Sequence, residues 1–357
     1  MADSAAKEPV TEPTQAPSPF GRNVAPQDRW LVIAIRVLVL AVVVVGVYLA
    51  WNYYSDIRLR DTQSPAARAV ANLAAIVDKS PNVAMARVRL AEAMTANGQR
   101  AEAIAQLEAA IKLEKDNVAA LTDLGLIAMD QRQWAKAQQY WTKLIDILGA
   151  AEMANQDQRL ADVYYYLGTT FVEQAKYEDA VANLKKSITI KRDASPVHYM
   201  LSVAYQRLGL PDMQQQELSI VLAFDPLNAQ ASYDMGLVLL KQGDTAGAAE
   251  MFRTAADRAP SGITDPQRQL DLLGDGPARL AEAVKLETSD PKRALIDARI
   301  AAAIMPTDAS AVRLIARLWE VEKDPKRAQN AWERLLELVP RDTQATDAIK
   351  RLTTNAK

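Results

Sequence analysis

The chain has 357 residues, with 42 Lys and Arg against 44 Asp and Glu, and no cysteine. The net charge is near zero, so the chain lacks the overall basic excess of a nucleic-acid-binding domain. A net charge near zero still allows a local basic patch. Disulfide frameworks, thiolate metal sites and cysteine nucleophiles are excluded. Abundant Ala and Leu with only 13 Gly favours an all-helical chain.

The N-terminal part predicts a polar tail followed by a membrane span. Residues 1–29 contain five prolines and no hydrophobic periodicity, which is typical of disorder. Residues 30–54 are almost purely apolar, with Arg36 as the one charge, and Val37–Tyr54 supplies 18 uncharged residues. That length is the lower edge of a transmembrane helix. Tyr48 and Trp51 lie near its far end, where amphipathic rings favour the headgroup layer.

Two other readings of this segment are weaker. A cleaved signal peptide is disfavoured because the apolar stretch is long and no small-residue cleavage site follows it. A buried helix of a soluble domain is disfavoured because the segment has no polar face. For the orientation, three arginines flank each side, so the positive-inside rule gives a tie. Arg36 can reach the N-terminal face most easily, which favours a cytoplasmic N-terminus and an extracytoplasmic C-terminal domain.

Residues 55–83 predict a linker and a lone helix over Pro65–Lys79, followed by Pro81 in a terminating position. Beyond them, the pentapeptide Asp-Pro-Lys-Arg-Ala occurs at Asp290–Ala294 and again at Asp324–Ala328. The offset of 34 residues is the length of one repeated helix–turn–helix unit. The same spacing, with two insertions, predicts units that begin at Ala84, Val118, Ala161, Ser195, Ala229, Asp275 and Ala309.

Equivalent positions of these units carry equivalent residues. Positions seven and eight, such as Leu124-Gly125 and Leu167-Gly168, are apolar and small, as two closely packed helices require. Position 20 holds Ala103, Ala137, Ala180, Gln214, Ala248, Ala294 and Ala328. Prolines at position 32 end the second helix, and glycines between helices suit a left-handed turn. Asp290 and Asp324, each followed by proline, are predicted to cap second helices. Insertions near 151–158 and 263–274 are expected to lengthen a helix or to form a loop.

This pattern resembles the tetratricopeptide repeat family over residues 84–342. The resemblance implies an all-α protein: a right-handed α-solenoid of about seven units, preceded here by a single transmembrane helix. Residues 343–357 are expected to form a C-terminal capping helix and tail, because a repeat array must cover its last interface. Gln214 at a position that favours a small residue departs from the family pattern.

In the family, positions 2, 5, 9, 12 and 13 of each first helix line the concave face. This implies a peptide-binding groove whose centre is apolar and aromatic. The candidate peptide-binding residues are Tyr165, Tyr199, Tyr233, Leu126, Met129, Thr169, Val172, Val203, Leu237 and Leu240. Tyrosine offers large contact area at low rotamer cost. The alternative is that the three tyrosines pack between neighbouring helices.

Some members of the family bind acidic tails through Lys, Arg and Asn at these positions, and that clamp is not recognisable in the central units. Arg279, Arg313 and Arg317 offer a basic patch at the C-terminal end, but solvated helix-face charge is the preferred explanation. His198 is the one histidine, so a two-histidine metal site is excluded and a structural role is expected. Phosphate-loop, nucleophile-elbow and zinc-protease motifs do not occur. We therefore predict no catalytic residues, no metal and no cofactor.

The sequence predicts a membrane-anchored scaffold that captures a polypeptide, apolar or partly unfolded, in its groove, without a role for nucleic acid. The architecture is similar to bacterial envelope proteins that assist cytochrome c biogenesis, translocon-associated folding or envelope assembly, which places it in a bacterial cell membrane. An adaptor that recruits soluble proteins to the cytoplasmic face is the alternative. An enzyme on a helical scaffold is a more remote one.

Overall fold

The computed structural model describes residues 29–62, 64–259 and 265–355, and their regular structure is entirely helical. The predicted tail over 1–28 lies outside this part of the chain. The helices are α1 (Arg29–Thr62), α2 (Pro65–Lys79), α3 (Ala84–Ala96), α4 (Arg100–Leu113), α5 (Val118–Asp130), α6 (Trp134–Gly149), α7 (Gln158–Glu173), α8 (Tyr177–Ile190), α9 (Ser195–Arg207), α10 (Pro211–Phe224), α11 (Ala229–Gln242), α12 (Thr245–Arg258), α13 (Asp265–Leu272), α14 (Gly276–Leu286), α15 (Pro291–Ile304), α16 (Ala309–Val321), α17 (Pro325–Leu338) and α18 (Thr343–Asn355). A 3₁₀ turn, η1 (Ala154–Gln156), precedes α7.

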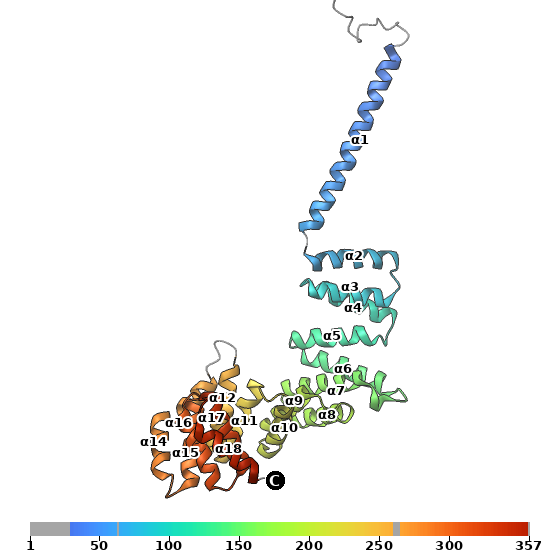
Figure 1. Cartoon of the computed structure of the whole chain (residues 1–357). Coiled ribbons are helices and arrows are strands. Elements are labelled where there is room, and N and C mark those ends of the chain that lie inside the picture. Colours follow the sequence, from blue (N-terminus) through green and yellow to red (C-terminus); the bar gives the residue numbers. More distant parts are fainter. Residues whose placement is uncertain (1–28, 63, 260–264, 356–357) are drawn as a thin grey trace, which may run out of the picture.

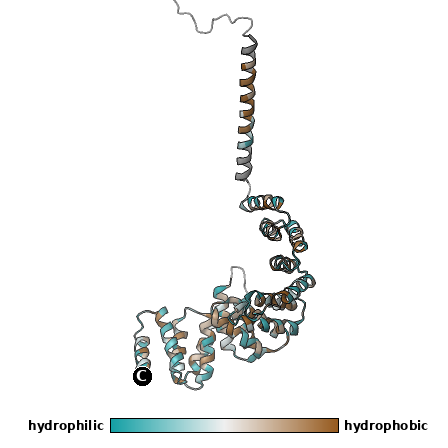
Figure 2. Ribbon diagram, turned by 90° about the vertical axis from the view of Figure 1, so that its right-hand side faces the viewer, coloured by the Kyte–Doolittle hydropathy of each residue, from teal (hydrophilic) through white to brown (hydrophobic). Residues whose placement is uncertain are grey.

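Helix α1 stands away from the other helices as a single rod (Figure 1). Its segment Val37–Tyr54 has a mean hydropathy of 2.0 and buries none of its side chains in the protein. Figure 2 shows this segment as a continuous hydrophobic stretch. By length and composition it can cross a membrane. The helix continues to Thr62, beyond the predicted end at Tyr54, and the side chain of Arg36 lies outside the described residues.

The remaining helices form antiparallel pairs that stack into an all-α solenoid (Figure 1). Turns within the pairs use left-handed backbone, at Gly98, Gly209 and Gly243 with φ between 70° and 87°. Arg132 and Ala175 adopt the same conformation without being glycine. The two copies of Asp-Pro-Lys-Arg-Ala begin second helices: Asp290 and Asp324 cap α15 and α17, as predicted from Asp before Pro at a helix start.

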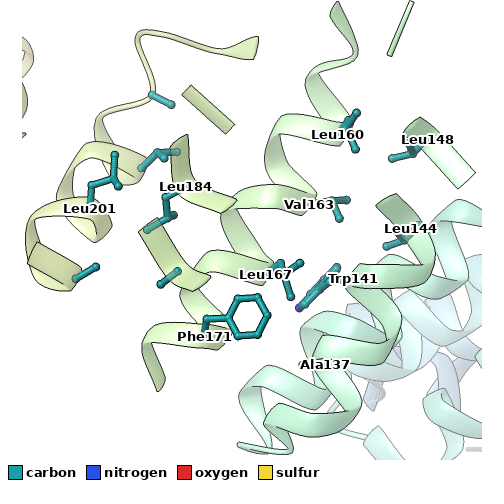
Figure 3. Packing of buried hydrophobic residues seen from close by; sticks show 14 of the residues in the cluster. Ala137, Trp141, Leu144, Leu148, Leu160, Val163, Leu167, Phe171, Leu184 and Leu201 are labelled. Atoms are coloured by element: carbon teal, nitrogen blue, oxygen red, sulfur yellow. The ribbon is translucent and has the colours of Figure 1, made fainter. Parts of the chain in front are cut away.

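The core of each pair forms where a small residue on the first helix faces a large one on the second. Trp141 of α6 and Leu184 of α8 are fully buried, and both belong to the largest core cluster. Figure 3 shows Trp141 directed at Leu167, with Leu144, Leu148 and Val163 along the same seam. A Cβ built on Gly125 of α5 would lie 2.5 Å from Trp141 Cη2, so only glycine admits this ring.

The two insertions have different structures. Around 151–158 the chain forms η1, and α7 begins at Gln158, three residues before the predicted start. Between α12 and α14 the inserted residues that are described form the separate helix α13. Helix α12 then packs against both α13 and α15, whereas α10 packs against the adjacent first helix α11. The regular stacking is therefore interrupted between α12 and α15.

We expect Gly125→Ala to lower the free energy of unfolding by about 1–3 kcal/mol, because the added methyl group overlaps the buried Trp141 ring. Urea unfolding followed by circular dichroism measures this loss. Gly149→Ala is the matched control: it lies in α6 with no atom within 4 Å of the added Cβ, so its stability should stay unchanged or rise slightly. Equal stability of both variants would contradict the packing described above.

Candidate functional site

The ten residues predicted to bind peptide lie on the first helices α5, α7, α9 and α11. Leu126 is exposed, with 39% of its surface accessible, and the other nine are half-buried. A half-buried apolar side chain is held by its neighbours and still offers contact area to a ligand. The structure thus leaves all ten residues partly accessible along four successive first helices.

The three tyrosines each contact a neighbouring helix or residue. The Tyr199 hydroxyl donates to Asp234 Oδ2 of α11 at 3.0 Å. The Tyr233 ring lies 5.8 Å from the Phe252 ring of α12, and the Tyr165 ring lies 5.3 Å from the Tyr166 ring. These contacts combine inter-helix packing with exposure, so the two interpretations of the tyrosines are not exclusive.

The core clusters divide the predicted residues into groups. Met129, Tyr165 and Val172 border the largest cluster, which is centred on α6 and α7. Tyr233, Leu237 and Leu240 border a cluster around α12, and Tyr199 borders a third. Leu126, Thr169 and Val203 border none of these clusters. The candidate surface therefore consists of two apolar groups with Tyr199 between them along the chain.

A cavity of about 650 Å³ opens beside this surface, between α3, α5 and α7. Its lining residues are Met85, Glu114, Asp116, Asn117, Val118, Ala119, Thr122, Asp123, Leu148, Arg159, Asp162, Val163 and Tyr166. Apolar side chains form its walls, and acidic side chains outnumber the single basic one. None of the ten predicted residues lines it, although Ala119, Asp162 and Thr122 occupy positions two and five of their units, which the family register places on the concave face. Asp123 and Tyr166, at position six, were not predicted.

Asp123 is the most perturbed acid of the cavity. Burial, reinforced by the negative charge of Glu92 on α3, raises the pKa of Asp123 from 3.8 to about 6. Asp123 makes no hydrogen bond or ion pair with any described residue. Arg159 does not neutralise it, because its guanidinium is engaged by Asp157 at 2.8 and 3.1 Å. This end of the surface therefore holds uncompensated negative charge.

A second acid lies near the middle of the surface. Burial raises the pKa of Asp234, and hydrogen bonds from Tyr199 and Gln230 partly oppose that shift. The pKa of Tyr199 is raised in turn by burial and by the Asp234 charge, so its hydroxyl stays protonated and acts as the donor. This contact links α9 to α11 at the candidate surface.

The C-terminal arginines are neutralised by ion pairs. Arg313 lies 2.6 Å from Asp342, Arg317 lies 2.9 Å from Glu287, and Arg279 pairs with Asp297. They are therefore not a free basic patch, and they are ion-paired rather than simply solvated.

His198 is buried inside the α9–α10 pair. Its Nε2 donates to the Arg192 carbonyl oxygen at 3.0 Å, since a carbonyl can only accept, and its Nδ1 lies 2.7 Å from Glu217 Oε2. A side chain held on both nitrogens has a structural role. Within the described residues, no group of three or more His, Asp or Glu is placed to hold a metal ion.

Comparison with known proteins agrees with the helical pairs. Two models of the tetratricopeptide repeat family match residues 116–193 and 199–263. The chain therefore contains tetratricopeptide repeats (TPRs) over these residues. Members of this family are in general protein-binding scaffolds rather than enzymes, and the arrangement of half-buried side chains on successive first helices suits that role.

A segment of 97 residues is 30% identical to BBSome complex member bbs-4 of Caenorhabditis elegans, and it spans 27% of this chain and 21% of that protein. Among solved structures, YrrB, described as a TPR protein with an unusual peptide-binding site, is 18% identical with a TM-score of 0.44, over 53% of this chain and 93% of YrrB. The C-terminal part of a TPR protein from Cytophaga hutchinsonii is 16% identical with a TM-score of 0.47, over 83% and 98%.

We expect Asp123→Asn to raise the free energy of unfolding at pH 7.5 by about 1 kcal/mol, after allowance for solvent screening of a partly exposed group. The folded-state pKa of about 6 exceeds the unfolded value of 3.8, so ionised Asp123 destabilises the native state above that pH. The gain should vanish near pH 3, below both pKa values, where the carboxyl is mostly protonated in the folded and the unfolded state. Urea titrations at the two pH values measure it. Asp146→Asn, at an exposed acid of α6, should change stability at neither pH.

Proposed function

We propose that this TPR protein captures a polypeptide on the surface formed by the first helices α5, α7, α9 and α11. One observation carries the proposal: ten apolar, aromatic or hydroxyl side chains on these helices remain partly accessible although their neighbours are buried. An extended or helical segment with apolar side chains is the ligand that such a surface fits. The hydroxyls of Thr169 and Tyr199 donate to Tyr165 and Asp234, so their oxygens would orient the ligand by accepting from its backbone N–H groups.

The acidic cavity extends this surface at its N-terminal end. It favours ligands that carry no negative charge at that end. Asp123, Asp162 and Glu92 would repel an acidic segment. This agrees with the lack of a recognisable carboxylate clamp. The proposed ligand is therefore an apolar or partly unfolded segment without acidic residues at the end that contacts α3 and α5.

We propose further that α1 anchors the array in a bacterial cell membrane, with the N-terminus cytoplasmic and the repeats outside. The exposure and hydropathy of Val37–Tyr54 support the anchor. The repeat array over 84–342, with its cap over 343–357, would then stand beside the membrane, where tethering raises its effective concentration near membrane-bound or translocating partners. Assistance in envelope-protein assembly, such as cytochrome c biogenesis or translocon-associated folding, fits this placement.

The groove is tested by binding to an array of immobilised 15-residue peptides of varied apolar and charged content. The triple change Tyr165→Ala, Tyr199→Ala and Tyr233→Ala should abolish capture, because it removes the aromatic contacts of three consecutive units. Since Tyr199 and Tyr233 also contact neighbouring helices, helicity and the urea midpoint are checked for this variant.

A milder pair of variants separates binding from folding. Leu126→Ser removes an exposed groove side chain and should weaken peptide capture several-fold with little effect on stability. Leu113→Ser, at a similarly exposed leucine that ends α4, is the control and should bind like wild type. Full binding by both Leu126→Ser and the folded triple variant would refute the groove.

The anchor is tested by fractionation and by reporters at the C-terminus. Full-length protein should sediment with membranes, and deletion of residues 1–63 should release it, because Val37–Tyr54 is the segment long and apolar enough to span. A C-terminal alkaline phosphatase fusion should be active, and a green fluorescent protein fusion exported through the general secretion route should be dark. The reverse pattern would support the cytoplasmic adaptor.

A further inference from the structure

Two adjoining cavities lie among the helices of the C-terminal pairs and include none of the ten groove candidates. The first, of about 500 Å³, lies between α12, α15, α16 and α17. Its lining residues are Asp244, Glu250, Arg299, Trp319, Arg327, Asn330, Ala331 and Arg334. The second, of about 330 Å³, shares Glu250, Arg299, Ala331 and Arg334 with it and also includes Arg253 and Asp257. The shared residues make the two cavities one continuous surface.

Ion pairs occupy two of the four arginines on this surface. Arg299 forms a bidentate pair with Glu250, at 2.7 and 2.9 Å, and the pairing raises the pKa of Arg299. Arg253 lies 2.8 Å from Asp257 on the same helix. These contacts neutralise the middle and one side of the surface.

The other two arginines keep most of their charge available. Within the part of the chain that the structure describes, the Arg334 guanidinium donates one hydrogen bond, to the Pro306 carbonyl oxygen at 3.5 Å. Arg327 lies over the Trp319 ring, 4.7 Å from its centroid, and is 3.5 Å from Asp324, a distance that gives only a weak pair. Both guanidinium groups are exposed and line the first cavity.

The helix geometry aligns these two arginines. Arg327 and Arg334 are seven residues apart on α17, so they lie on one face, about 10 Å apart along the axis. Asn330 lies between them on the same face and lines the same cavity. The result is a row with cationic groups at both ends and an amide that can donate and accept in the middle.

We propose that this row binds an acidic polypeptide segment, at a site separate from the groove. A planar guanidinium presents paired N–H donors that match a carboxylate, and stacking on Trp319 holds the Arg327 plane in place. In a polyproline II segment, which has three residues per turn, side chains at positions i and i+3 lie on one face about 9 Å apart, so two carboxylates at these positions reach both arginines. One small anion spans only one of them, which favours a segment over a single free ion.

The interrupted stacking accounts for the location of this site. Because α12 packs on α15, the Asp244 end of α12 and the Arg299 face of α15 lie opposite α17 across the first cavity. Arg327 belongs to the second copy of Asp-Pro-Lys-Arg-Ala. The equivalent Arg293 of the first copy lines neither cavity. The two identical pentapeptides therefore have different surroundings, and only the second contributes to the site.

The test measures binding of a fluorescent, acetylated and amidated eight-residue peptide with two Glu at positions i and i+3 among Ala and Gly. Fluorescence anisotropy with full-length protein in detergent gives the Kd at low and at physiological salt. We expect the Glu peptide to bind at least about tenfold more tightly than its Gln counterpart, with the preference reduced by salt. The double variant Arg327→Ala and Arg334→Ala should remove that preference, and Arg327→Lys should lose part of it.

Arg293→Ala is the matched control, since it removes the equivalent arginine from the first pentapeptide, and it should bind like wild type. The triple tyrosine variant should also keep the preference, which separates this site from the groove. Equal binding of the Glu and Gln peptides, or an unchanged preference in the folded double variant, would overturn the proposal. Two results together would also overturn the proposal in favour of a simple anion site. Inorganic phosphate at millimolar concentration would compete completely, and a peptide with one Glu would compete equally well.

Discussion

The contact between a small residue on the first helix and a large one on the second sets the geometry of this protein. Gly125 admits the Trp141 ring, Gly168 admits Leu184 and Gly236 admits Phe252, each with no room for a Cβ. The close approach buries the large side chain of each second helix and leaves other faces of the first helix outside the core. The groove residues lie at the edge of these contacts and stay partly accessible; Tyr233, for example, packs against Phe252 and is half-buried.

The arrangement of charge differs between the two halves of the array. At the α3–α5–α7 end, Lys143 and Arg159 pair with Asp116 and Asp157, and burial together with the Glu92 charge raises the pKa of Asp123. At the α12–α17 end, most acids and arginines pair, and Arg327 and Arg334 retain free charge. A chain with nearly balanced totals therefore carries surfaces of different charge, and the two proposed binding sites depend on this difference.

Repetition made much of the fold predictable. Small residues at position eight, Ala at position 20 and Asp-Pro at a helix start act within one unit, so their consequences can be read locally; the caps at Asp290 and Asp324 were confirmed. The apolar stretch Val37–Tyr54 was equally plain, since hydropathy is a property of the residues themselves. The ten groove residues follow from the family register and remain a prediction of function, although their partial exposure agrees with it.

By itself, the sequence determined the all-helical class, the 34-residue spacing, the helix caps and the apolar segment, because each depends on residues close in the chain. Only the tertiary structure decided which charges meet. Asp123 responds to Glu92 of the preceding unit, Arg317 pairs with Glu287, and Arg327 differs from Arg293 through its surroundings alone. The inserted helix α13 altered the stacking of α12 and α15. Electrostatic interactions depend on distance and burial, which repeat spacing does not encode.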